Sequence, residues 1–222
     1  MTARPLVKVC CIASVEEARL ARAHGAAALG LVSAMPSGPG VIADARIAEI
    51  AAAMSGTGLR SFLLTARTDA DAIAAQHAAA GTTTLQLVDA VPVAELRRLR
   101  ALCPGVELVQ VVHITDEAAL ARAEAVAPWV DALLLDSGNP ALAVKQLGGT
   151  GRTHDWALSR RIRDAIAPCP LWLAGGLRVH NVAQAIAAVR PHGLDLCTGV
   201  RRDGRLDAAL LADFMAAVQA AA

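Results

Sequence analysis

Aromatic side chains are scarce in this chain, which has no tyrosine, two phenylalanines and three tryptophans among 222 residues. Proteins that bind single-stranded nucleic acid stack bases on such side chains, so the composition argues against a base-stacking surface. Charge of one sign is not in excess either, because 21 lysines and arginines face 20 aspartates and glutamates. The resulting net charge of +1 argues against a general nucleic-acid binder.

Long apolar runs are also missing, because charges or glycines interrupt them well short of a membrane span. The stretch from Met1 to Pro5 lacks the apolar region of a signal peptide, so no leader is expected.

The five cysteines are an odd number and form no CxxC pair. We therefore expect a reduced, cytoplasmic protein with no membrane partner. Vicinal Cys10 and Cys11 should point to opposite faces of a strand, so they would not easily share a metal.

Short runs rich in leucine and β-branched residues alternate with alanine-rich amphipathic runs along the whole chain. Apolar residues spaced by three and four, as at Ile47, Ile50 and Met54, favour helices in the second kind of run. Start signals at Ser14, at Thr115 and at Asp155 agree with them. The predicted strands span residues 6–12, 27–32, 60–65, 84–89, 107–114, 131–136, 170–176 and 193–199. The predicted helices span residues 14–24, 43–54, 68–80, 92–103, 116–126, 155–166, 179–189 and 206–221.

Eight strand–helix units in a chain of this length predict an α/β fold with a single closed (β/α)8 barrel, the TIM barrel. No linker or composition break divides the chain, so residues 1–222 are predicted to form one domain. A doubly wound open sheet, which also alternates strands and helices, is the alternative. In a barrel the chemistry lies at the C-terminal ends of the strands, where the side chains that bear on function are expected.

The run Gly148–Trp156 has four small residues followed by an arginine. Backbone N–H groups of such a loop can approach a phosphate closely. Its spacing fits neither a Walker loop nor a dinucleotide fingerprint. Two further small-residue turns follow predicted strands 7 and 8, where barrel enzymes recurrently bind phosphate. The predicted phosphate-binding residues are Gly148, Gly149, Thr150, Gly151, Gly175, Gly176, Thr198 and Gly199.

Five segments, in the same order, resemble the phosphoribosylanthranilate isomerase family. They are Lys8–Cys10, Leu133–Ser137, Gly148–Trp156, Leu173–Leu177 and Asp195–Val200, and they span nearly the whole chain. Family members read K-[IV]-C-G, LLDS, GGTG[KR]T-x-DW, LAGGL and VD-x-[ST]SGVE at these places. The resemblance implies a (β/α)8 enzyme of tryptophan biosynthesis, which opens an aminoribofuranose and moves a proton from C2′ in an Amadori rearrangement. It implies a phosphosugar substrate, and neither a cofactor nor a metal.

The resemblance also implies roles for individual residues. Cys10 maps to the general base and Asp136 to the general acid. An acid that must keep its proton benefits from burial, and a thiolate is a serviceable base where positive charge lowers its pKa. Lys8 and Asp195 are expected in the site by the same resemblance. Asp89 either begins a helix or contacts a basic group of the substrate.

The chain departs from the family pattern at four places. Gly40 replaces an arginine that lies near the anthranilate carboxylate, and Cys11 replaces a glycine. Arg201 replaces a glutamate, and Val88-Asp89 replaces a His-Gly pair. The departures are predicted to lie on the amine side of the site or at its rim. A carboxylate without its guanidinium partner loses about 1.5–3 kcal/mol. Weak turnover of the anthranilate substrate is therefore expected, and Gly40→Arg is expected to raise it.

Structural roles are alternatives to these catalytic roles, and other functions are alternatives to the isomerase activity. Cys10 could be an inert strand cysteine, Cys11 is expected to pack on the other face of the strand, and His113 is expected to be a satisfied core or rim histidine. The chain could also be a diverged paralogue acting on another phosphosugar amine, or a barrel that binds a phosphate ligand without catalysis. A monomer and a homodimer are both open.

Overall fold

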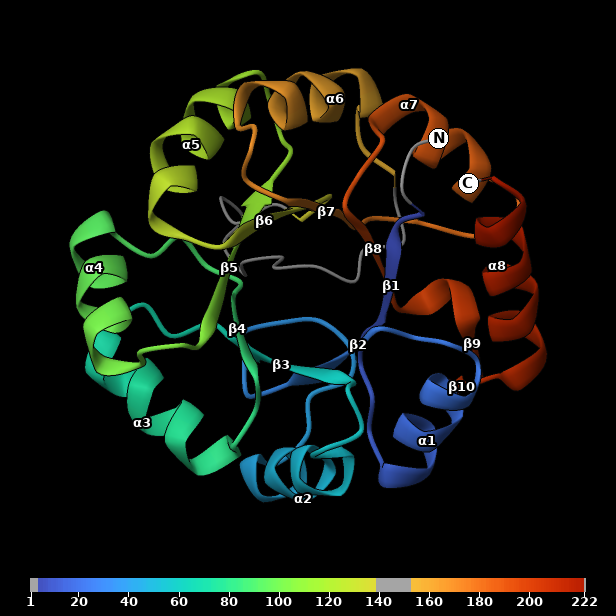
Figure 1. The fold of residues 1–222 in the computed structure, drawn as a ribbon, viewed down its shortest axis with the longest axis horizontal. Coiled ribbons are helices and arrows are strands. Elements are labelled where there is room, and N and C mark those ends of the chain that lie inside the picture. The colour runs from blue at the N-terminus through green and yellow to red at the C-terminus, as the bar shows by residue number, and fades with distance from the viewer. Residues whose placement is uncertain (1–3, 139–152, 222) are drawn as a thin grey trace.

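The computed structural model describes residues 4–138 and 153–221. Eight parallel strands close into a barrel, and the helices surround it (Figure 1). The strands are β1 (Leu6–Val9), β2 (Ala28–Val32), β3 (Arg60–Thr65), β4 (Thr84–Leu87), β5 (Glu107–His113), β6 (Ala132–Asp136), β7 (Leu171–Leu173) and β8 (Gly193–Leu196). The helices are α1 (Val15–Ala23), α2 (Asp44–Met54), α3 (Ala70–Ala80), α4 (Val93–Leu102), α5 (Ala118–Val126), α6 (Trp156–Ala165), α7 (Val182–Val189) and α8 (Ala208–Ala220).

Pairing of β8 with β1 closes the barrel and sets Lys8 beside Asp195 in register. The predicted (β/α)8 fold is thus confirmed, and the open sheet that stood as its alternative is wrong. All eight strands and all eight helices lie where the periodicity places them. Within the described residues, no helix is long and apolar enough to cross a membrane.

Four strands end earlier than predicted. The predicted strands that start at residues 6, 84, 170 and 193 run two or three residues past the observed ends. Some of these residues, such as Cys10 and Ala174, still donate backbone hydrogen bonds to a neighbouring strand at the mouth of the barrel. At Cys11 the backbone turns to a φ of 61°, and Gly175 and Gly176 also have positive φ. Apolar composition therefore continues beyond the residues with regular strand geometry.

Two of the three predicted helix starts are confirmed. Ser14 caps α1 by accepting from the N–H of Glu17, and Asp155 caps α6 by accepting from two backbone N–H groups. Thr115 does not cap α5, which begins at Ala118 after Glu117 and has no side-chain cap. The acidic pair that follows Thr115 in the sequence was therefore a misleading start signal.

Inside the barrel, aromatic side chains fill the end opposite the mouth. The rings of Phe62 and Trp172 meet edge to face, with centroids 5.7 Å apart. Trp172 is fully buried, and a Cβ on Gly193 would lie 2.3 Å from its ring. Glycine at the start of β8 is therefore required by the size of this indole. Within the described residues, these rings fill the interior of the barrel at the end opposite the C-terminal ends of the strands.

After β8 the chain forms the short 3₁₀ helix η2 (Thr198–Val200) and a two-stranded hairpin, β9 (Arg201–Arg202) and β10 (Arg205–Leu206). Arg201 forms an ion pair with Glu17 of α1. The Glu17 carboxylate also accepts from the N–H of Leu206. This hairpin is thereby fastened to the first helix, beside the junction of β1 and β8.

Candidate active site

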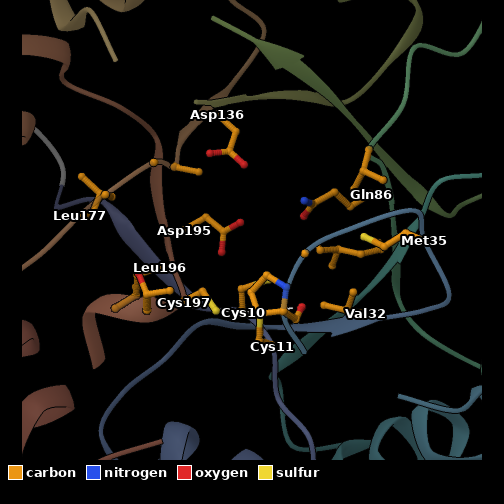
Figure 2. A pocket seen from close by; sticks show the side chains of 18 of the residues that line it. Cys10, Cys11, Val32, Met35, Gln86, Asp136, Leu177, Asp195, Leu196 and Cys197 are labelled. Atoms are coloured by element: carbon orange, nitrogen blue, oxygen red, sulfur yellow. Dashed lines mark hydrogen bonds between the residues drawn. The ribbon is translucent and has the colours of Figure 1, made fainter. Parts of the chain in front are cut away.

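An open cavity lies at the C-terminal ends of the strands. Figure 2 shows the carboxylates of Asp136 and Asp195 and the sulfur of Cys10 around this hollow. They come from β6, from β8 and from the end of β1, so the closed barrel brings together residues far apart in the chain. The two residues predicted as acid and base therefore share one cavity.

Asp136 ends β6, and its carboxylate points into the cavity (Figure 2). Its Oδ1 accepts a hydrogen bond of 2.7 Å from the N–H of Ser137. Burial raises the pKa of Asp136 above its ordinary value, and the nearby Asp195 carboxylate adds to this. The Ser137 N–H and His113 oppose that shift without cancelling it. A raised pKa helps a carboxylic acid to keep the proton that a general acid must donate.

Lys8 lies beneath the cavity, fully buried inside the barrel. Its Nζ donates to Asp195 Oδ2 at 2.7 Å and to Gln86 Oε1 at 2.8 Å, and it lies 5.1 Å from the Phe62 ring centroid. Burial lowers the pKa of Lys8, but the Asp195 carboxylate and the neighbouring cysteines outweigh it, so the pKa lies above its ordinary value. Lys8 therefore stays charged beneath the two cysteines at the end of β1.

Asp195 lines the cavity and is 7% exposed. Its Oδ2 is held by Lys8, whereas Oδ1 is buried and has no hydrogen-bond partner within the described residues. A buried carboxylate oxygen without a donor is costly. Asp195 is thus oriented by Lys8 and keeps one acceptor for a hydroxyl group in the cavity.

The prediction that Cys11 packs on the opposite face from Cys10 is wrong, because both line the cavity. The chain leaves β1 after Val9, and the positive φ of Cys11 breaks the alternation that the prediction assumed. The Cys11 sulfur lies 2.7 Å from the sulfur of Cys197, which follows β8. Three cysteines therefore gather at one side of the mouth (Figure 2).

Arg201, the replacement for the family's glutamate, lies beneath the same side of the mouth. Its guanidinium pairs with Glu17 and donates to the backbone carbonyls of Cys10 and Cys11. This side chain is largely buried, so it acts as a brace for the end of β1. Arg201, predicted to lie at the rim, thus holds the backbone of Cys10, the residue that the family pattern identifies as the base.

Gly40 packs directly against Cys11. A Cβ at Gly40 would lie 2.5 Å from the Cβ of Cys11 and 2.9 Å from its Cα, and φ at Gly40 is +80°. No larger residue fits this place without movement of the backbone, which argues against Gly40→Arg as a way to raise turnover; its effect on turnover stays a prediction. The two departures at residues 11 and 40 are coupled, since the Cys11 side chain occupies the space that a residue-40 side chain would take.

We expect Gly40→Ala to lower the free energy of unfolding by about 2–4 kcal/mol, from backbone strain and the collision with Cys11 together. Urea denaturation measures this loss. Gly56→Ala is the matched control, because Gly56 has a φ of +71° and nothing within 4 Å of a new Cβ. Adding Cys11→Gly should restore part of the loss at Gly40 and none at Gly56. Equal losses in the two single variants would contradict the collision.

The described part of the predicted phosphate site lies at one side of the cavity. Gly175, Gly176 and Thr198 line it, after β7 and β8. Gly199 does not line the cavity, but a Cβ there would lie 2.3 Å from the carbonyl oxygen of Leu177, so a glycine is required. Gly148, Gly149, Thr150 and Gly151 fall outside the described residues.

Of the pair after β4, Val88 lines the cavity and half-buried Asp89 does not. Asp89 Oδ1 accepts from the N–H of Ala90. His113 is buried, and its Nε2 lies 3.0 Å from the Val88 carbonyl oxygen, whereas its Nδ1 has no hydrogen-bond partner within the described residues. The prediction of a satisfied core histidine therefore holds for one of the two ring nitrogens. The contact of Asp89 with a substrate group stays a prediction.

Sequence reasoning missed Gln86 and Cys197 as cavity residues. Gln86 is a polar side chain flanked by Leu85 and Leu87 in β4, and this inward polar position was a usable signal. For Cys197 the signal was its place in the family pattern, which has serine or threonine there, but no local pattern shows its contact with Cys11, 186 positions away. An apolar side of the cavity, formed by Val32, Met35 and Leu64, was also missed.

Comparison with known proteins gives a consistent result. A family model described as N-(5'phosphoribosyl)anthranilate (PRA) isomerase matches residues 66–217. The N-(5'-phosphoribosyl)anthranilate isomerase of Thermosynechococcus vestitus is 34% identical over 198 residues, which cover 89% of this chain and 82% of that protein. The corresponding enzyme of Methanocella arvoryzae is 30% identical over 214 residues, covering 96% and 97%.

Solved structures agree at the level of the fold. The crystal structure of phosphoribosyl anthranilate isomerase from Thermotoga maritima superimposes with a TM-score of 0.82, at 25% identity, over 97% of this chain and 99% of that chain. Family model, relatives and barrel lead to one assignment: the chain belongs to the N-(5'-phosphoribosyl)anthranilate isomerase family.

Proposed function

We propose that the protein isomerises N-(5'-phosphoribosyl)anthranilate, the step of tryptophan biosynthesis after which its family is named. The observation that carries this proposal is the single cavity that holds Cys10 and Asp136 beside the turns after β7 and β8. Residues 1–222 form one catalytic domain in this proposal. A monomer and a homodimer both fit it.

The two halves of the proton transfer are assigned to Asp136 and Cys10. Asp136, whose pKa burial raises, donates its proton to the ring oxygen of the aminoribofuranose, and the ring opens. The Cys10 thiolate then takes the proton from C2′, and the resulting enamine relaxes to the aminodeoxyribulose. Lys8 stays charged beneath the cysteines at the end of β1.

Binding is divided between the two sides of the cavity. The turns at Gly175–Gly176 and Thr198 face the 5′-phosphate, together with the predicted glycine loop at residues 148–151. The free Oδ1 of Asp195 accepts from a sugar hydroxyl. The aryl ring lies against Val32, Met35 and Leu64. A related crystal structure contains the reduced product analogue 1-(o-carboxyphenylamino)-1-deoxyribulose 5-phosphate, at 23% identity to this chain.

Steady-state turnover of phosphoribosylanthranilate, followed by loss of its fluorescence, tests the proposal. We expect measurable isomerisation with a KM about ten- to a hundredfold above that of a relative that keeps the arginine, because the anthranilate carboxylate lacks that partner. Growth of a tryptophan auxotroph lacking the isomerase gives a second readout. No turnover and no growth, with a folded protein, would refute the activity.

One observation favours a second candidate function. The described residues that line the cavity include no lysine and no arginine. An amine without a carboxylate would therefore bind there with no unpaired charge, which fits a paralogue acting on another phosphoribosyl amine. The phosphoribosyl derivative of aniline separates the two candidates. Turnover of that compound at least as efficient as that of the anthranilate substrate would favour the paralogue.

A further inference from the structure

Two cysteines that depart from the family pattern contact each other at the mouth of the barrel. Cys11 replaces the family's glycine, and Cys197 stands where the family has serine or threonine. Their sulfurs lie 2.7 Å apart, and both residues line the active-site cavity. We propose that Cys11 and Cys197 form a reversible disulfide, which makes this pair a redox modification site beside the catalytic residues.

The backbone around both cysteines holds the sulfurs together before any bond forms. Cys11 and Cys197 follow β1 and β8, which pair in register up to Val9 and Leu196. Arg201 donates to the carbonyl of Cys11, and Gly40 packs against the other side of the same residue. A disulfide bond is about 2.05 Å long, so the sulfurs approach by less than an ångström and the barrel need not rearrange.

The surroundings give the two sulfurs different reactivity. The hydrogen bond with Cys11 lowers the pKa of Cys197. Burial opposes this shift, and the Arg201 guanidinium supports it. Hydrogen bonds to the sulfurs of Cys10 and Cys197 raise the pKa of Cys11. Cys197, which is only partly buried, is therefore the thiolate that reacts first, and Cys11 is the thiol that resolves it.

The oxidant is hydrogen peroxide, which enters through the cavity. The Cys197 thiolate attacks one peroxide oxygen, the O–O bond breaks, and the products are Cys197 sulfenic acid and hydroxide. The Cys11 sulfur then displaces water from the sulfenic acid, and its proton leaves with that water. The two cysteines lose two electrons, the peroxide gains them, and a dithiol reverses the reaction by exchange.

The other three cysteines are placed differently. The Cys10 sulfur lies against β2, where a Cβ on Gly30 would be 2.7 Å from it. Cys103 is buried at the end of α4, and Cys169 precedes β7 at the opposite end of the barrel from the mouth. Oxidation of Cys11 and Cys197 should therefore leave three thiols of the five in the sequence.

The test treats the full-length protein with a modest excess of hydrogen peroxide, alkylates the remaining thiols and measures intact mass. We expect the alkylated thiols to fall from five to three, a peptide map that links Cys11 to Cys197, and full reversal by dithiothreitol. Cys11→Ser and Cys197→Ser should each abolish the link, whereas Cys103→Ser, the matched control, should keep it. Mass readouts do not depend on turnover, so this test and that of the proposed function fail separately.

A second measurement needs no variant. The disulfide would close a loop between residues 186 positions apart, so the oxidised protein should melt about 5–15 °C higher than the reduced protein. A link that includes Cys10, oxidation of Cys197 to the sulfinic acid without a link, or five thiols left after peroxide would each overturn the proposal. If the Cys11–Cys197 disulfide forms but the melting temperature does not change, the sulfurs are not held together before the bond forms, and the proposal is overturned.

Discussion

Asp136→Asn lowers kcat for the isomerisation by about 10²–10⁴-fold, the range that a general acid contributes. The amide cannot protonate the ring oxygen, yet its oxygen still accepts from the Ser137 N–H as the carboxylate does. Steady-state kinetics with phosphoribosylanthranilate measures the loss. Asp213→Asn, an exposed position on α8, is the control and should leave kcat unchanged. Equal activity of the two variants would remove Asp136 from the mechanism.

The same variant should gain stability, and the gain depends on pH. The folded-state pKa of Asp136 is raised above the ordinary value of 3.8, so the folded protein holds this proton more tightly than the unfolded chain. This stabilisation is complete below pH 3.8 and is lost as pH rises through the folded pKa. Asp136→Asn should therefore exceed the wild type in free energy of unfolding at neutral pH, and less so in acid. For the same reason kcat of the wild type should fall as pH rises through the pKa of Asp136.

Lys8→Met lowers the free energy of unfolding by about 3–5 kcal/mol, because it leaves the Asp195 carboxylate buried without its cation. Urea denaturation at neutral pH measures the change. Arg46→Met is the comparison, since the Arg46–Glu49 pair is about half exposed and should be worth about 1 kcal/mol or less.

A double variant separates the lost charge pairing from a packing defect. Lys8→Met with Asp195→Leu removes both charges, and we expect it to recover most of the stability lost in Lys8→Met. If Lys8→Met alone is as stable as the wild type, or the double variant is no better than the single, the buried pair does not hold the barrel together. Activity should be lost in both variants. The double variant removes Asp195 from the cavity, and Lys8→Met removes the cation that orients Asp195.

The fold could be predicted because its signals are local. Apolar spacing along α2 and the β-branched and leucine-rich run of β3 each identify an element within a dozen residues. Strand ends also placed Cys10, Asp136 and Asp195 at the mouth, since a closed parallel barrel puts all C-terminal ends together. The family pattern supplied the roles of these residues, which the spacing alone could not.

The rest depended on contacts between distant residues. The face of Cys11 was predicted from strand alternation, but its positive φ ends that alternation at β1. The packing of Gly40 could not be predicted either, because its neighbour in space is Cys11, far from it in the sequence. No local pattern reports that a glycine at one place and a cysteine at another occupy a shared volume.

The pairing of β1 with β8 also bears on the order in which the chain folds. Lys8 is made early on the ribosome, but its carboxylate partner emerges 187 residues later. Until β8 docks, the first seven strands form an open sheet whose two edges are unpaired and whose ammonium group must stay hydrated. Docking of β8 pairs the backbone groups of both edge strands, β1 and β7, and brings Asp195 to the Lys8 ammonium group in the same step. Closure should thus be a late, highly non-local step, and a nascent chain that stalls before residue 193 would be exposed to edge-to-edge aggregation.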